Sequence, residues 1–101
     1  MNEKKVLNLL GLAQNAGRVK SGGFLAEKAV RDGYAELILV AEDASDSTKD
    51  KYQKMCQYYE VTCRILADKE LLGRFTGNEF RSVAAVCDRG FAKAMIKLID
   101  A

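Results

Sequence analysis

Histidine, tryptophan and proline are absent from this chain of 101 residues. Without histidine, the sequence lacks the commonest general base and the commonest metal ligand. Only three cysteines occur, and their odd number and wide spacing fit neither a disulfide framework nor a zinc site. Cys63 and Cys87 lie in apolar runs. We therefore expect buried free thiols in a reducing cytosol, and hence a cytoplasmic protein.

Long apolar runs and catalytic motifs are missing as well. No stretch approaches the roughly 20 apolar residues of a membrane span, and no signal peptide is visible, so we expect no membrane partner. The sequence contains no phosphate loop ending in lysine, no GxGxxG motif, no GxSxG motif and no histidine to assist a cysteine nucleophile. We therefore expect neither an enzyme nor a site for a cofactor or metal.

One acidic pair keeps an enzymatic alternative open. Glu42 and Asp43 follow a continuous apolar run, and α/β folds place their sites at the ends of such strands. An adjacent acidic pair is also typical of a solvated turn before a helix. No nucleophile and base accompany these carboxylates, so the solvated turn is the favoured interpretation.

Helical and strand patterns alternate along the whole chain. Hydrophobic periodicity predicts helices at residues 3–15, 23–32, 47–59, 69–75 and 91–99, and strands at 18–20, 36–41, 61–66 and 82–87. The predicted helix caps are Asn2, then Ser47 or Asp46, then Asp68. The alternation indicates one α/β domain over residues 1–101, with helices on both faces of a sheet of about four strands.

Two helices carry specific predictions about their inward faces. In the second helix we expect Phe24, Leu25, Ala29 and Val30 to face inward. In the third helix we expect the inward residues to be Tyr52, Met55, Cys56 and Tyr59.

Charge is segregated along the chain, although the formal net charge is only +2. Residues 1–34 carry six basic and three acidic groups, residues 35–63 carry three and six, and residues 64–101 carry seven and five. A basic face and an acidic face are therefore possible on one fold. The acidic segment, residues 42–50, supports an alternative function as a protein-interaction module.

The stretch from Gly17 to Gly33 is the strongest candidate for a binding site. Gly22 and Gly23 open a helix there, and glycine lets a ligand approach the backbone closely. The first N–H groups of a helix point outward without partners, and the helix dipole favours an anion beside them. The surrounding cations are Arg18, Lys20, Lys28 and Arg31. An ordinary helix start with a solvated basic face shares these features, so both interpretations remain open.

Several segments, in order and over nearly the whole chain, resemble bacterial proteins of YlxQ type. These segments are LLGLA at residues 9–13, AGR at 16–18, SG at 21–22, LILVAEDAS at 37–45, TK at 48–49, Cys56, YYEV at 58–61, ELLG at 70–73 and VAAVCDRGFA at 83–92. YlxQ-type proteins belong to the ribosomal-protein superfamily of L-seven-Ae and L-thirty-e type. The resemblance implies a three-layer α-β-α sandwich with a mixed sheet, and binding to structured RNA, especially kink-turns.

The resemblance also implies two places of RNA contact. The first is the turn into the second helix, where the superfamily typically has glycine, a small residue, asparagine, glutamate, two variable residues and lysine. This chain keeps Gly22 and Lys28 but has Phe24 and Leu25 in place of asparagine and glutamate. Those two residues cannot hydrogen-bond to base edges, which loses about 1–3 kcal/mol of discrimination. Phe24 can instead stack on a base, or both side chains can pack into the core.

The second implied contact is the loop before the last strand. It corresponds to residues 75–81, where Gly77 permits close approach and Asn78 and Arg81 can meet phosphate or base. A plain connecting loop is the other interpretation. The resemblance therefore implies a non-enzymatic RNA-binding protein that takes kink-turn-like RNA and associates with the ribosome or ribosomal RNA, and we expect it to be a monomer.

Overall fold

Four short strands form one mixed sheet at the centre of the molecule. In the computed structural model, which describes residues 1–101, they are β1 (Val19–Ser21), β2 (Leu37–Val40), β3 (Thr62–Ile65) and β4 (Val83–Val86), in the spatial order β1-β4-β2-β3. Strand β4 pairs antiparallel with both β1 and β2, whereas β2 and β3 are parallel. The last strand of the sequence, β4, therefore lies inside the sheet rather than at its edge.

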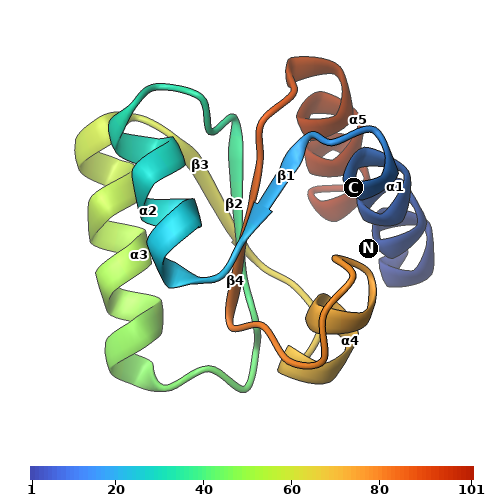
Figure 1. Cartoon of the computed structure of the whole chain (residues 1–101), viewed down its shortest axis with the longest axis horizontal. Coiled ribbons are helices and arrows are strands. Elements are labelled where there is room, and N and C mark those ends of the chain that lie inside the picture. Colours follow the sequence, from blue (N-terminus) through green and yellow to red (C-terminus); the bar gives the residue numbers. More distant parts are fainter.

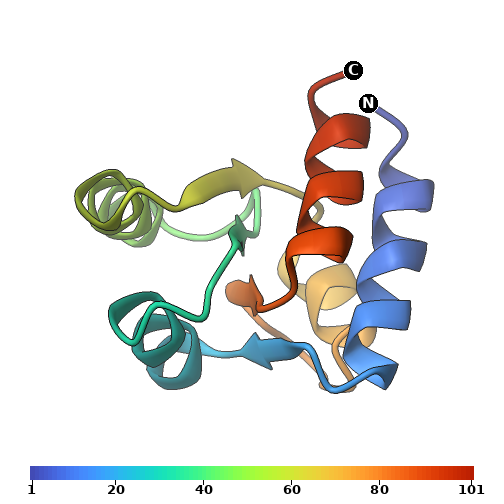
Figure 2. The ribbon, with the colours of Figure 1, turned by 90° about the horizontal axis from the view of Figure 1, so that it is seen from above.

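Five helices cover the two faces of this sheet. They are α1 (Glu3–Asn15), α2 (Gly23–Arg31), α3 (Asp46–Tyr59), α4 (Lys69–Arg74) and α5 (Arg89–Ile99). Helices α2 and α3 lie on one face, and α1, α4 and α5 lie on the other (Figures 1 and 2). The predicted three-layer α-β-α sandwich with a mixed sheet is confirmed. No helix has both the length and the apolar character needed to cross a membrane.

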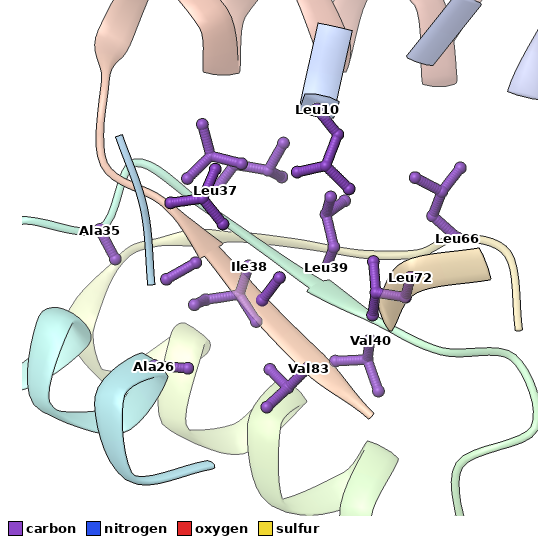
Figure 3. Packing of buried hydrophobic residues seen from close by; sticks show 14 of the residues in the cluster. Leu10, Ala26, Ala35, Leu37, Ile38, Leu39, Val40, Leu66, Leu72 and Val83 are labelled. Atoms are coloured by element: carbon purple, nitrogen blue, oxygen red, sulfur yellow. The ribbon is translucent and has the colours of Figure 1, made fainter. Parts of the chain in front are cut away.

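The two central strands hold the core together. Every residue of β2 and β4 is buried, as expected for strands covered on both faces. Leu37 and Leu39 point toward Leu10 of α1, whereas Ile38 points toward the layer that contains Ala26 of α2 (Figure 3). This alternation follows from the two-residue period of a strand. Each such leucine contributes about 1.5–3 kcal/mol by its burial.

Side chains cap four of the five helices at their N-termini. Asn2 caps α1 and Asp68 caps α4, which confirms both predictions, and Asp88 caps α5. The prediction of Ser47 or Asp46 for α3 is wrong. The Oγ atom of Ser45 accepts a hydrogen bond from the Thr48 backbone at 3.1 Å, because Ser45 is the last extended residue before the helix.

The inward face of α2 is built from small residues. Ala26, Ala29 and Val30 are buried, but Phe24 is 77% exposed and Leu25 is 45% exposed. The prediction that Phe24 and Leu25 face inward is therefore wrong. The spacing of the three buried positions sets the direction of the helix, and the first-turn side chains project away from the sheet.

Two further burial predictions also need correction. On α3, Tyr52 and Cys56 are buried as expected, but Tyr59 is 41% exposed because the helix ends there, beside the left-handed residue Glu60. All three cysteines are free thiols. Cys63 and Cys87, however, are only partly buried, since each lies at the margin of the sheet rather than at its centre.

Candidate nucleic-acid interface

Helix α2 begins without a side-chain cap. Its N-cap is Gly22, with φ 89° and ψ 157°, a conformation that favours glycine. The backbone N–H of Gly22 donates to the Val83 carbonyl at 3.0 Å, which ties this turn to the start of β4. The N–H groups of Gly23, Phe24 and Leu25 have no helical partner, and no loop or side-chain atom accepts from them. Three outward-facing donors therefore remain available at this end of the helix.

Both glycines lie close to neighbouring side chains. A Cβ atom at Gly22 would lie 3.6 Å from Nε of Arg81. A Cβ atom at Gly23 would lie 3.2 Å from the hydroxyl of Tyr52 and 3.5 Å from Oε2 of Glu27. The glycines thus allow polar groups from α3 and from the loop before β4 to surround the helix start.

A hydrogen-bond network joins the two places that the sequence singled out. Nδ2 of Asn78 donates to Oγ of Ser21 at 2.9 Å, and Nη2 of Arg81 donates to Oδ1 of Asn78 at 2.8 Å. Nε of Arg81 also reaches the Ser21 oxygen at 3.4 Å. Because both ends of the Asn78 amide are engaged, this side chain orients Arg81 beside Gly22. Direct contact of Asn78 with phosphate or base stays a prediction from the sequence.

The loop itself is fixed against α4 through Gly73. A Cβ atom at this position would lie only 2.6 Å from the Glu79 carbonyl oxygen, so no other residue fits without moving the loop. The Gly73 carbonyl accepts from the backbone of Thr76 at 3.0 Å and of Asn78 at 2.8 Å. Sequence reasoning missed the supporting roles of Ser21, Gly73 and Thr76. A glycine inside a helical pattern was the available signal.

An open hollow of about 400 Å³ lies beside the start of α2. It contains backbone, acidic, basic and aromatic groups; its lining residues are Gly22, Gly23, Glu27, Thr48, Lys51, Tyr52, Phe80, Arg81, Ser82 and Val83. Glu27 accepts hydrogen bonds from the Tyr52 hydroxyl and from Nζ of Lys51, both at 3.1 Å. Burial, and then the charge and hydrogen bond of Glu27, raise the pKa of Tyr52, so this hydroxyl stays protonated. The hydrogen bond to Glu27 holds Lys51 at the rim of the hollow.

Two phenylalanines add exposed flat surfaces to this region. Phe24 projects from the first turn of α2, and Phe80, in the loop before β4, lines the hollow with 57% of its surface exposed. Gly77 has φ 75° and allows the turn that begins this loop. Exposed aromatic rings beside free backbone donors provide both stacking surfaces and hydrogen-bond donors for a ligand.

The predicted cations do not all surround the glycine pair. Arg18, Lys20 and Lys28 line a second hollow, which lies along the side of α2. Nζ of Lys28 donates to Asp32 at 2.7 Å, and this hydrogen bond, together with the charge of Asp32, raises the pKa of Lys28. Arg31 lies 3.9 Å from Glu27 and lines neither hollow. Of the predicted cations, only Arg81 shares a hollow with Gly22 and Gly23.

The acidic segment has mainly structural contacts. Oδ1 of Asp43 accepts from the Lys69 backbone N–H at 2.8 Å and so holds the start of α4. Asp46 lies in the first turn of α3, where a negative charge is favoured, and Asp50 pairs with Lys54 at 2.9 Å. These contacts favour the turn-and-cap interpretation of Glu42 and Asp43.

The three-layer sandwich and the second helix, which begins at a glycine pair, are typical of one class of protein, the small ribosomal-protein-like α-β-α folds. Residues 4–96 match the Ribosomal protein L7Ae/L30e/S12e/Gadd45 family. The chain belongs to this family, which confirms the resemblance seen in the sequence.

Several relatives cover most of the chain. It is 45% identical over 92 residues to the RNA-binding protein YlxQ of Bacillus subtilis (strain 168), with 91% of this chain and 92% of that protein aligned. It is 37% identical over 99 residues to the RNA-binding protein YlxQ of Enterococcus faecium, covering 98% and 95% of the two chains. The large ribosomal subunit protein eL8 of Haloquadratum walsbyi is 32% identical over 97 residues, covering 94% of this chain and 81% of that protein.

Solved structures show the same architecture. A Bacillus halodurans C protein of unknown function superimposes with a TM-score of 0.91 at 35% identity, covering 96% of this chain and 98% of that chain. The Giardia lamblia 15.5kD RNA binding protein gives a TM-score of 0.82 at 24% identity, covering 99% and 91%, and this likeness concerns the fold alone.

Proposed function

We propose that this chain is a non-enzymatic RNA-binding protein that acts as a monomer, through one domain spanning residues 1–101. Its ligand is a structured, sharply bent RNA of the kink-turn kind, and ribosomal RNA is the natural source of such an element. Family membership and the two relatives named as RNA-binding proteins support this proposal.

The observation that carries the proposal is the bare start of α2. Three N–H groups there lack acceptors, and Arg81 and Lys51 lie at the same hollow. A phosphate group suits this arrangement, because it accepts several hydrogen bonds and its charge complements the helix dipole and Arg81. Lys51 pairs with Glu27 at 3.1 Å and so balances the one carboxylate of this hollow. Arg81 is already oriented by Asn78, so little ordering is needed on binding.

The exposed phenylalanine decides how the RNA is recognised. Phe24 offers no hydrogen bond to a base edge, but its ring is free to stack on an unpaired or terminal base. Leu25 is likewise unable to read a base edge. The protein therefore recognises the path of a bent backbone and an exposed base plane, and it tolerates changes in the bases themselves.

A titration of a kink-turn RNA and of a straight duplex with the same composition, each at several salt concentrations, tests the proposal. We expect tighter binding to the bent RNA at every salt concentration. We also expect the logarithm of the association constant to fall linearly with the logarithm of salt, as phosphate contacts require. Equal affinity for the two RNAs would refute recognition of the bend.

Three variants separate the contributions of one aromatic ring and two cations to RNA binding. Phe24→Ala should weaken binding to the bent RNA about 10-fold without lowering the melting temperature, because the ring lies outside the core. Arg81→Ala should flatten the salt slope by about one unit, whereas Lys28→Ala should flatten it by less, because Lys28 pairs with Asp32 at 2.7 Å. The matched control is Lys97→Ala on α5, in the helix layer on the other side of the sheet, which should change neither quantity. A melting temperature lowered by Phe24→Ala would indicate a packing role instead.

A further inference from the structure

The hollow along the side of α2 is separate from the bare start of that helix. Its volume is about 430 Å³, within the range of roughly 300–1,000 Å³ that is usual for small-molecule sites. Apolar groups from three segments line it: Leu25 and Ala29 of α2, Tyr34 after the helix, and Cys87 after β4. Such a surface suits a flat, apolar group.

Cations surround this apolar surface. Arg18, Lys20 and Lys28 line the hollow with only one acidic residue, Asp32. Asp32 pairs with Lys28 at 2.7 Å, whereas neither Arg18 nor Lys20 forms an ion pair. Two cations are therefore left to balance an anionic group of a ligand.

Backbone hydrogen bonds fix the walls of the hollow. The N–H of Cys87 donates to the Arg18 carbonyl at 2.7 Å, and the N–H of Tyr34 donates to the Ala29 carbonyl at 2.9 Å. The Tyr34 ring is nevertheless 69% exposed. Its phenol lies near Lys28, whose pKa it raises further after the larger effect of Asp32. The site is thus already shaped, with an aromatic ring presented at its edge.

We propose that this hollow binds a nucleotide. The base lies on Leu25 and stacks against Tyr34, while the phosphate meets Arg18 and Lys20. A nucleotide combines the flat ring and the anion that the lining complements, and stacking on tyrosine is tolerant of base identity. The nucleotide is either an unpaired residue of the bound RNA, in which case the inference rests on the proposed function, or a free mononucleotide.

Leu25 is the residue that makes this hollow suitable for a nucleotide. It stands where glutamate is usual in the superfamily, and its side chain is 45% exposed rather than buried. A carboxylate at this position would add a second negative charge opposite Asp32 and would repel a phosphate. The same departure that removes a base-edge contact therefore provides an apolar surface.

The first test uses free nucleotides and the full chain labelled with nitrogen-15. We expect adenosine and guanosine monophosphates to shift the backbone amide signals of Lys28, Tyr34 and Cys87, and to leave those of Gly22 and Gly23 unchanged. The nucleoside alone and inorganic phosphate, each lacking half of the ligand, should bind at least about 10-fold more weakly.

The second test uses bent RNA with and without one unpaired nucleotide. Tyr34→Ala should weaken binding about 10-fold only for the RNA that carries the unpaired nucleotide. The matched control is Tyr58→Ala, which removes an 81%-exposed tyrosine outside this hollow and should have no effect. Thermal unfolding shows whether each variant is folded.

The outcomes distinguish a free mononucleotide from an unpaired nucleotide of the RNA, and they distinguish this inference from the proposed function. Dependence on Tyr34 with free nucleotides identifies a free ligand, and dependence only with the extended RNA identifies an unpaired nucleotide. If the bent RNA binds but Tyr34→Ala changes neither test, the inference is wrong while the proposed function stands. If mononucleotides bind through Tyr34 but no RNA binds, the proposed function is wrong while this inference stands.

Discussion

Helices α2 and α3 lie on the same face of the sheet but begin in opposite ways. At the start of α3, the Ser45 hydroxyl accepts from the Thr48 backbone and contacts the hydroxyl of Thr48 at 2.9 Å, so a side chain of the same segment caps one N–H group of the first turn. At the start of α2, Gly22 provides no side chain, and three N–H groups are left open. The difference separates a helix start that stabilises the fold from one that is free to hold a ligand.

The two helix starts also differ in their dependence on distant residues. The turn at Ser45 needs only its neighbours in sequence. The turn at Gly22 is surrounded by Ser21, Asn78 and Arg81, and the bonds among them join segments 57 and 60 residues apart. A substitution in the loop before β4 is therefore expected to affect α2 and to leave α3 unchanged.

The largest effect is expected from Gly73→Ala, which tests this dependence directly. The added Cβ would meet the Glu79 carbonyl at 2.6 Å, so the loop must move and Arg81 must leave Gly22. We expect a loss of about 3 kcal/mol in the free energy of unfolding, measured by urea denaturation, together with weaker RNA binding. The matched control is Gly11→Ala, whose Cβ meets Phe75 at an ordinary 3.5 Å. It should stabilise α1 by up to about 1 kcal/mol.

Gly22→Ala is expected to have the next largest effect. At φ 89° and ψ 157° an alanine is strained, so we expect a loss of about 2 kcal/mol in the free energy of unfolding. RNA affinity should fall as well, because the turn that presents the free N–H groups is distorted. Loss of stability with unchanged RNA affinity would show that the α2 start takes no part in binding.

Ser45→Ala provides the converse case at the start of α3. Removing the cap should cost about 1 kcal/mol of stability, and the affinity for bent RNA should stay the same. Urea denaturation and an RNA titration on the same preparation measure both. A drop in affinity as large as that of Gly22→Ala would erase the proposed distinction between the two helix starts.

The smallest effect concerns an ion pair remote from both helix starts. Nε and Nη2 of Arg64 donate to the two carboxylate oxygens of Asp100, each at 2.9 Å. This hydrogen bonding holds the pKa of Asp100 below its ordinary value of 3.8. The stabilisation is therefore complete above that value and is lost as the pH falls through the lower pKa of the folded state.

Comparison of the wild type with Asp100→Asn tests this sign. The wild type should be slightly more stable near pH 7, and the difference in melting temperature should shrink as the pH falls below about 4. RNA affinity at neutral pH should be the same for both proteins. A difference that grows in acid would contradict the assignment of the lowered pKa to this carboxyl group.

Most of the fold could be predicted from the sequence because periodicity and turn residues agree along the chain. All nine helices and strands fall within two residues of the predicted bounds. The direction of α2 could not be predicted as well, because its buried positions are mostly alanines while its largest apolar residues are Phe24 and Leu25. Hydrophobicity alone pointed to the wrong face, and only the spacing of the small residues indicates the right one.

The candidate site was predictable in part. The structure brings the turn before the glycine pair and the loop at 75–81 together, and their role in binding stays a prediction. The division of the cations between two hollows was not predictable, because it depends on which side of α2 each neighbouring segment reaches. Lys51 was missed for the same reason, since its position beside Glu27 joins residues 24 apart in the chain.

The place of β4 in the sheet has a consequence for when the surface around Gly22 forms during synthesis. Strand β1 pairs only with β4, and Ser21 is held by residues that immediately precede β4. Until about 86 residues have left the ribosome, β1 has no partner and Arg81 has no fixed position. Such contacts between distant segments form late in folding. The proposed RNA-binding surface is therefore assembled only when the fold is almost complete.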